Sequence, residues 1–226
     1  MEFLPLFRNL LEGFGVTLKL FGLTLVIAIP LGLVVALLSM SRFKPLSYLM
    51  KAIIWVVRGT PLLLQCVLIT FLPSIFGMQS KAIAAFFGCS VSDVLFILVL
   101  IAFGLNYACY FAVIFEGGIR NIPRGQYEAG QVLGLTRTQI FFHVILMQLF
   151  RRILAPMSNE IITLVKDTAL AKALGVVEIL CVANNAVNKY VVLTPLAYAA
   201  AFYLAFSAVL TWLFHRLDKK LSYYSV

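Results

Sequence analysis

The sequence contains little charge: only 12% of its 226 residues are Asp, Glu, Lys or Arg, whereas soluble domains carry about 25%. Hydrophobic residues make up 62% of the chain, and the mean hydropathy is +1.01. A chain with so few charged groups cannot cover a soluble surface, which excludes an ordinary soluble domain. The composition therefore predicts an integral membrane protein that is solvated largely by lipid.

Catalytic and nucleotide-binding motifs are also missing. The chain has no G-x-x-x-x-G-K-[ST] phosphate loop, so we do not expect it to bind ATP by itself. It has no H-E-x-x-H zinc motif, and its two histidines, His143 and His215, are far apart. No Ser, His and Asp residues can be grouped into a catalytic triad. We therefore expect no enzyme activity and no cofactor in this chain.

The four cysteines lack the short spacing of a metal site; they are Cys66, Cys89, Cys109 and Cys181. Cys89 and Cys181 fall in segments that we place outside the membrane, so a disulfide between them is one alternative. Free thiols buried among the spans are the simpler interpretation, and the one we favour.

Four segments are long and apolar enough to cross a bilayer, which takes about 20 helical residues, and a fifth apolar region, fourth in chain order, is interrupted by charged residues. The fourth contains Glu160, Lys166 and Asp167, so it is either a crossing with a polar lining or a re-entrant segment. We count it as a crossing. The prediction is a single all-α transmembrane domain, 1–226, with spans at about 15–40, 53–76, 93–115, 150–175 and 191–214.

The net charge of +9 reflects topology, because the basic residues form no exposed stripe of the kind that binds nucleic acid. With the end of the first span inside, four basic residues lie outside and twelve inside. The outer ones are Arg8, Lys19, Lys81 and Lys189; the inner ones are Arg42, Lys44, Lys51, Arg58, Arg120, Arg124, Arg137, Arg151, Arg152, Arg216, Lys219 and Lys220. The positive-inside rule then places the N-terminus outside and the C-terminus in the cytoplasm. Five crossings satisfy this arrangement.

Two irregular segments stand out in the first half of the chain. Residues 1–14 mix apolar and polar groups and suit a short interfacial helix on the outer surface, with no cleavable signal sequence before it. In the second span, Gly59, Thr60 and Pro61 stand where a helix is weakened, because proline removes a backbone donor.

The longest stretch between spans, 116–149, is the main element expected in the cytoplasm. Within it, Gln126 to Gly134 is typical of a short helix ended by glycine, and Thr136 is a typical N-cap for a second helix. We expect a compact knob that meets a partner. Glu128, placed in the first turn, either binds a basic group of that partner or only caps its own helix.

Charged groups in the fourth span are candidates for a solute path. A charge at mid-membrane costs about 2.5 to 3.5 kcal/mol, so such residues usually face protein or water. Glu160, Lys166 and Asp167 either line the path or pair within the structure. Lys166 and Asp167 are adjacent, so they point apart on a helix and cannot pair with each other. Arg58, near the inner end of the second span, either reaches the headgroups or pairs with one of these acids.

Three motifs together resemble the permease subunits of polar amino acid ABC importers, over about residues 12–215. Glu128-Ala129-Gly130 followed by Gly134 and Ile145-Leu146 resembles the EAA loop, although Gly130 replaces an alanine and Met147 a proline. The other two motifs are Arg58-Gly59-Thr60-Pro61-Leu62-Leu63-Leu64-Gln65 and Asn159-Glu160 with Lys166-Asp167-Thr168.

The resemblance implies a type I ABC importer fold, with five transmembrane helices and a cytoplasmic coupling helix, in the bacterial plasma membrane. Partners would be a dimer of ATPases that bind ATP and Mg, an extracytoplasmic substrate-binding protein and a second permease, identical or related. ATPase coupling would fall to Glu128, Ala129, Gly130, Gly134 and Leu135. The solute path would involve Arg58, Thr60, Gln65, Glu160, Lys166, Asp167 and Thr168.

Two points qualify this resemblance. An ion-gradient-driven transporter is the alternative function, with Glu160 and Asp167 carrying the coupling ion; we find none of the internal repeats that are common in such carriers. The family pattern also pairs an acid and a base three residues apart at the end of the third span, where this chain has Val113 and Glu116. The resemblance therefore does not specify the amino acid.

Overall fold

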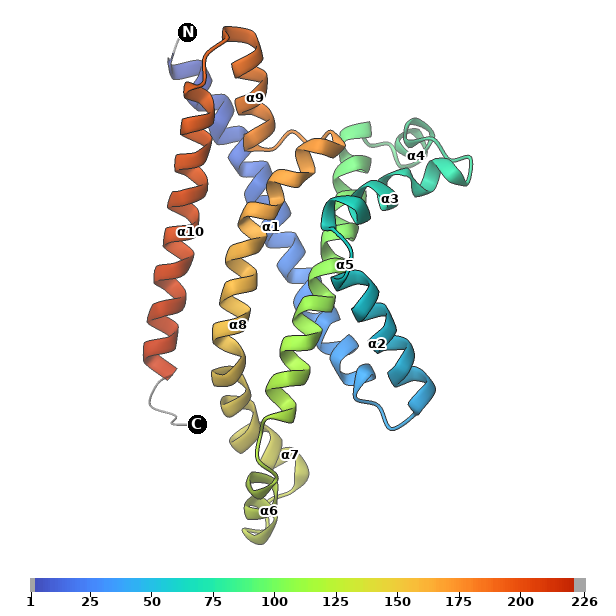
Figure 1. Cartoon of the computed structure of the whole chain (residues 1–226), viewed down its shortest axis with the longest axis vertical. Coiled ribbons are helices and arrows are strands. Elements are labelled where there is room, and N and C mark those ends of the chain that lie inside the picture. The colour runs from blue at the N-terminus through green and yellow to red at the C-terminus, as the bar shows by residue number, and fades with distance from the viewer. Residues whose placement is uncertain (1–2, 222–226) are drawn as a thin grey trace.

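The computed structural model describes residues 3–221, which are helical throughout apart from short connections, with no strand in this range. Figure 1 shows the long helices α5, α8 and α10 running roughly along the vertical axis of the view, with α1 crossing the bundle obliquely. In chain order the elements are α1 (Phe3–Ser39), α2 (Lys44–Arg58), α3 (Leu62–Ile75), α4 (Ser80–Phe87), α5 (Val91–Arg120), α6 (Arg124–Val132), α7 (Arg137–Gln139), the π-helical η1 (Ile140–Ile145), α8 (Leu146–Asp167), the 3₁₀-helical η2 (Thr168–Leu174), α9 (Ile179–Tyr190) and α10 (Thr194–Leu221).

The described helices provide up to five membrane crossings. Four stretches are long and apolar enough to cross alone: Leu4–Ser39, Val91–Arg120, Arg137–Leu174 and Thr194–Leu221. The helices α2 and α3 pass the same test only as a pair, and they are bent by 106° where they meet. The all-α, multi-span prediction is confirmed, and the second crossing is a broken one.

The core of the bundle is the crossing of α1 and α5, the most extensive helix contact in the structure. Small residues four apart on α1, Ala28, Gly32 and Ala36, face α5, and both alanines are fully buried. A Cβ on Gly32 would lie 2.8 Å from Phe111 Cβ. Such small-residue stripes let membrane helices approach closely, where dispersion contacts supply the attraction.

The beginning of α1 differs from the prediction. We expected a separate interfacial helix at 1–14, but from Phe3 onward these residues belong to one continuous helix; residues 1 and 2 lie outside the described range. The reason is tertiary packing: Leu6 and Leu10 are buried against Ile179 and Ala183 of α9. With this apolar face covered, the first turns continue the transmembrane helix.

The break in the second crossing lies where the sequence indicates it. α2 ends at Arg58, and α3 begins at Leu62 after Pro61, which adopts an extended conformation (ψ 135°). The prediction that Arg58 stands near one end of the crossing is wrong. It closes a 15-residue helix that starts at Lys44, so it lies about 20 Å along the crossing, at 1.5 Å per residue.

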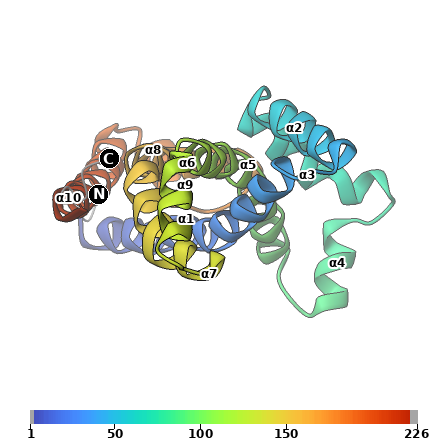
Figure 2. The same cartoon turned by 90° about the horizontal axis from the view of Figure 1, so that it is seen from below.

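The two ends of the bundle carry different elements. α6 and α7 form a knob at one end, whereas α9 and the start of α1 lie at the other (Figure 1). The α3–α4 segment projects sideways, and Figure 2 shows α4 at the edge of the molecule opposite α10. The connection between the second and third predicted spans, 77–92, thus contains a helix, α4.

Candidate functional site

The knob forms largely as the sequence predicts. α6 follows Pro123 and ends before Gly134, whose φ of +76° lies in the left-handed region that glycine tolerates. Thr136 then caps α7: its hydroxyl accepts the Gln139 N–H at 3.3 Å, and the Gln139 carboxamide accepts the Thr136 N–H at 2.9 Å. One detail is wrong. Because α6 begins at Arg124, Glu128 lies in its second turn and not in its first.

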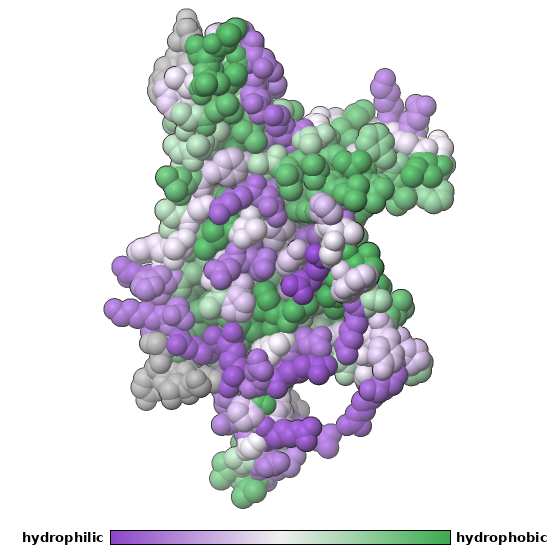
Figure 3. Space-filling model, in the orientation of Figure 1, coloured by the Kyte–Doolittle hydropathy of each residue, from purple (hydrophilic) through white to green (hydrophobic). Residues whose placement is uncertain are grey.

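The two faces of α6 have different surroundings. Gly130 is buried, and an added Cβ would lie 2.6 Å from Ile140 Cγ1. Glu128 and Ala129 are exposed, Gly134 has open space beside its Cα, and Leu135 is half-buried against the core. Two apolar residues between Gly130 and Gly134 are also uncovered: Val132 is 87% exposed and Leu133 77%. Figure 3 shows an apolar tip at this end of the molecule.

A polar cluster surrounds the break between α2 and α3. Gln65 Nε2 donates to the Val57 carbonyl at 2.6 Å and to Thr60 Oγ1 at 2.7 Å. Asn106 Nδ2, on α5, donates to Gln65 Oε1 at 3.0 Å. Gln65 therefore satisfies a carbonyl released where α2 ends, which is how a broken membrane helix avoids unpaired backbone groups.

Charged groups from α2 and α8 gather beside this cluster. The Arg58 guanidinium is exposed and lies 5.0 Å from the centre of the Tyr110 ring. Asp167 Oδ2 accepts a hydrogen bond from the Tyr107 hydroxyl at 2.7 Å. Glu160 is seven residues before Asp167 and so shares its helix face, close enough to interact electrostatically with both Arg58 and Asp167.

The structure brings five of the seven predicted path residues together and separates two. Arg58, Thr60, Gln65, Glu160 and Asp167 lie around the break, as described above. Lys166 instead lines a groove of about 620 Å³ between α8 and α10. Thr168 is fully buried, and its hydroxyl donates to the Val165 carbonyl at 2.6 Å. As predicted, Lys166 and Asp167 point to different neighbours.

Two residues of this cluster, Asn106 and Tyr107, were not identified from the sequence. They lie on α5 and are buried, with exposures of 3% and 2%. Both belong to the predicted third span, 93–115, for which we predict no path residue from the sequence. The signal was Asn106, an amide inside a membrane segment, where a polar group needs a partner.

Two other acids, Glu116 and Glu178, stabilise the helix bundle and lie outside the polar cluster. Glu116, at the departure from the family pattern, pairs with Arg120 at 2.8 Å and accepts the Ser39 hydroxyl at 2.7 Å, which ties α5 to α1. Glu178 is fully buried and caps α9, accepting the backbone N–H groups of Leu180 and Cys181 at 2.8 and 2.7 Å. Burial raises the pKa of Glu178 above its ordinary range, although these donors oppose the shift.

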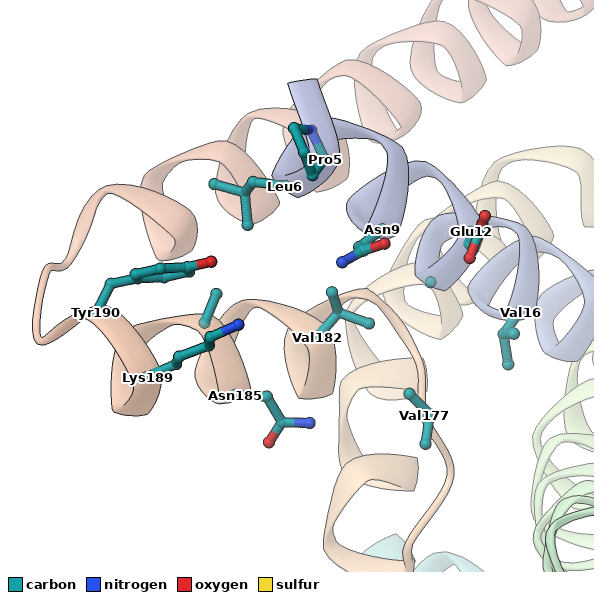
Figure 4. A pocket seen from close by; sticks show the side chains of 12 residues that line it. Pro5, Leu6, Asn9, Glu12, Val16, Val177, Val182, Asn185, Lys189 and Tyr190 are labelled. Atoms are coloured by element: carbon teal, nitrogen blue, oxygen red, sulfur yellow. The ribbon is translucent and has the colours of Figure 1, made fainter. Parts of the chain in front are cut away.

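A pocket of about 510 Å³ opens at the end of the bundle opposite α6. It lies between the first turns of α1 and α9, and Figure 4 shows the Asn9 amide, the Lys189 ammonium and the Tyr190 hydroxyl pointing into it. Glu12 and Asn185 add further polar groups to the lining. Both signs of charge and several hydrogen-bonding groups therefore meet at this surface.

All four cysteines are free thiols, so the alternative of a Cys89–Cys181 disulfide is not realised. Cys66 and Cys109 are buried, whereas Cys89 and Cys181 are partly exposed. Among residues 3–221, no group of three or more His, Cys, Asp or Glu side chains is arranged to hold a metal ion.

The knob and the broken span can be compared with known proteins. The family described as binding-protein-dependent transport system inner membrane component matches residues 28–223. The chain belongs to this family. It is thus a membrane-embedded component of a transport system, and the match includes both α6 and the polar cluster.

Curated relatives match nearly the whole chain. The arginine transport system permease protein ArtQ of Bacillus subtilis (strain 168) is 31% identical over 220 residues, which are 96% of this chain and 94% of the relative. The L-cystine permease protein TcyB of the same organism is 32% identical over 214 residues, 94% of this chain and 86% of the relative. The octopine permease protein OccM of Rhizobium meliloti is 32% identical over 229 residues, 96% and 90% of the two chains.

Solved structures share the fold. A crystal structure of an amino acid ABC transporter with histidines matches with a TM-score of 0.81 and 28% identity, covering 97% of this chain and 99% of that one. An inward-facing structure of the MetNI methionine ABC transporter matches with a TM-score of 0.64 and 20% identity, covering 96% and 95%. The expected type I ABC importer fold is confirmed.

Proposed function

We propose that this chain is the transmembrane subunit of an ATP-driven importer for a polar amino acid, and that α6 couples it to cytoplasmic ATPases. The observation that carries the proposal is the α6 knob: a short helix held against the bundle by one face, with its other face uncovered. The named relatives, which are permease proteins for arginine, cystine and octopine, support the class of solute.

The uncovered face of α6 is suited to a protein partner. Val132 and Leu133 expose most of their apolar surface at the tip of the knob, beside the carboxylate of Glu128. Exposed apolar residues rimmed by polar ones mark interaction sites. An ATPase groove with apolar walls and a basic residue at its edge would cover all three side chains. The ATPase dimer would bind the ATP and Mg, since the chain has no phosphate loop.

The polar cluster at the break is suited to a zwitterionic solute. The Arg58 guanidinium would bind the carboxylate of an amino acid, and Glu160 and Asp167 its ammonium group. Thr60 and Gln65 would hold the backbone of the broken span in place. Lys166 and Thr168 lie outside this proposed site, because their side chains point to other neighbours.

The same cluster calls for a second permease subunit. Arg58 is exposed in the single chain, about 20 Å along its crossing. A charge at that depth is costly against lipid, so it must face protein or a water-filled cavity. A second copy, or a related subunit, would enclose the cluster and complete the path.

Orientation follows from the charges. The basic residues Arg120, Arg124 and Arg137 lie at the α6 end, which the positive-inside rule places in the cytoplasm. The pocket between α1 and α9 would then face outward, where a substrate-binding protein delivers the solute. Its polar lining of both charge signs suits contact with a soluble protein. The N-terminus would lie outside and the C-terminus inside a bacterial plasma membrane.

Transport would follow from differential binding. ATP-driven closure of the ATPases would hold α6 in one position and favour outward access, and ATP hydrolysis would release it. The ATPase thereby shifts the population of two permease states, by as much as its affinities for them differ.

Gly134→Asp tests the docking role of α6. A non-glycine residue at φ +76° is strained, and an added acid at the end of the knob would disturb the partner's groove. We expect the variant to stay in the membrane and to lose ATP-dependent uptake. Gly88→Asp is the matched control, because Gly88 also has positive φ and open space but ends α4, far from the knob. Undiminished uptake in Gly134→Asp would refute the docking role.

A further inference from the structure

The end of α5 together with α6 is joined to the η1–α8 segment, the start of the fourth crossing, by three contacts, and the two segments run in opposite directions. Gly118, Gln126 and Gly130 are the positions on the α5–α6 side. Their partners on the η1–α8 side are Ile153, Gln148 and Ile140 respectively. The first position of one series meets the last of the other, so the two segments pack as an antiparallel pair beneath the bundle.

The first contact is the crossing of α5 and α8. A Cβ added at Gly118 would lie 2.4 Å from Ile153 Cγ2 and 2.8 Å from Leu149 Cδ1. Both side chains are buried, with exposures of 5% each. The adjacent Gly117 has nothing within 4 Å of its added Cβ. The close approach is therefore specific to position 118 and is not a property of the glycine pair.

The second contact is a hydrogen bond midway along the pair. Gln148 Nε2, on α8, donates to Gln126 Oε1, on α6, at 3.1 Å. Both side chains are half-buried. This bond fixes how far α6 can slide along α8, since a shift of one residue would separate the two amides.

The third contact depends on the π turn. The hydrogen bonds of a π-helix join residues five apart, which brings Ile140 and Ile145 toward one face of η1. Both are buried, with exposures of 2% and 1%. Ile140 fills the space beside Gly130, where a Cβ would lie 2.6 and 2.9 Å from its Cγ1 and Cδ1. Gly130, an alanine in the family pattern, gives this isoleucine its room.

We infer that these contacts make the end of α5, α6 and the start of α8 one rigid unit, with Gly118 and Gly130 as positioning residues that transmit the movement of α6 to α8. This inference rests on the proposed coupling function. The same helix α8 carries Glu160 and Asp167, so a displacement of α6 reaches the polar cluster through a single span. Glu160 lies about 20 Å from the start of α8, which begins at Leu146.

The test uses the complete transporter, purified with its ATPase and reconstituted in vesicles. The readout is the amount of labelled amino acid taken up per ATP hydrolysed, together with the amount of ATPase bound. We expect Gly118→Ala and Gly130→Ala to lower this ratio by about two- to thirtyfold, the usual range for residues that carry coupling, while the ATPase still binds. Gly117→Ala, the matched control, keeps the wild-type ratio.

A second substitution separates positioning from docking. Ile140→Ala removes the atoms that the new methyl group meets, so the Gly130→Ala/Ile140→Ala double variant should recover most of the ratio. Failure of this rescue, or a wild-type ratio in Gly130→Ala alone, overturns the inference.

If the glycine variants do not reach the membrane, Gln148→Leu is measured instead. This variant breaks the hydrogen bond to Gln126 without overpacking, and an unchanged ratio of uptake to ATP hydrolysis overturns the inference. A wild-type complex without ATP-dependent uptake would overturn the proposed function itself.

Discussion

Glu178→Ala is the substitution whose energetic cost can be worked out most directly from the structure. The Glu178 carboxylate is fully buried at the junction of α1, α9 and α10. It accepts three hydrogen bonds: from the N–H groups of Leu180 and Cys181 at 2.8 and 2.7 Å, and from the Tyr203 hydroxyl at 2.8 Å. Alanine removes the acceptor of these two N–H groups, which lie in the first turn of α9 and so have no intrahelical partner.

The expected loss is about 3 kcal/mol in the free energy of unfolding. Removing an N-cap acceptor typically costs about 1 kcal/mol, and each buried donor left without a partner costs about 1 to 3 kcal/mol. Part of this cost is offset, because the substitution also removes the unfavourable burial of the Glu178 carboxylate. That burial raises the pKa of Glu178. A loss of about 3 kcal/mol lowers the melting temperature by roughly 6 to 12 °C in a chain of this size.

Thermal unfolding in detergent, followed by intrinsic fluorescence, measures the loss. Glu12→Ala is the control: its carboxylate forms an exposed pair with Arg8 at 3.2 Å, and such pairs contribute about 0 to 1 kcal/mol. Equal melting temperatures for the two variants would refute the reasoning, because buried and exposed carboxylates would then contribute alike.

Three further results are expected. Because the pKa of Glu178 is raised, the folded protein holds this proton more tightly than the unfolded chain does. The free energy of unfolding should therefore fall as the pH rises from the ordinary glutamate range through the raised pKa. An equal dependence of the melting temperature on pH in wild type and Glu178→Ala would contradict this. Tyr107→Phe frees Asp167 from its 2.7 Å hydrogen bond, which should change half-saturation for uptake by about tenfold or more; unchanged half-saturation would remove Asp167 from the path. Membrane-impermeant maleimide should label Cys89 and Cys181 from outside without reductant, and labelling that needed reductant would indicate a disulfide.

The knob could be predicted from the sequence because its signals are local. Gly134 supplies the positive φ of the turn, and Thr136 with Gln139 supplies the cap of α7. The position of the break was equally visible in Gly59, Thr60 and Pro61. In each case, a few adjacent residues determine the backbone conformation, so no knowledge of distant contacts was required.

The sequence-based predictions failed at residues whose conformation or role depends on contacts with distant parts of the chain. The first turns of α1 continue the span because Leu6 and Leu10 pack on α9, which lies in the last quarter of the sequence. Asn106 and Tyr107 gain importance only when α3 and α8 pack on α5. The π turn of η1 follows from burying Ile140 and Ile145 together, which no helical periodicity indicates.

The most direct test of the account is to purify the tagged chain from its own host's membranes in mild detergent, identify what is retained by mass spectrometry, and measure amino acid uptake after reconstitution. The account predicts an ATP-binding subunit in stoichiometric amount and uptake that requires ATP. A chain recovered alone, with uptake driven by an ion gradient without ATP, would contradict it.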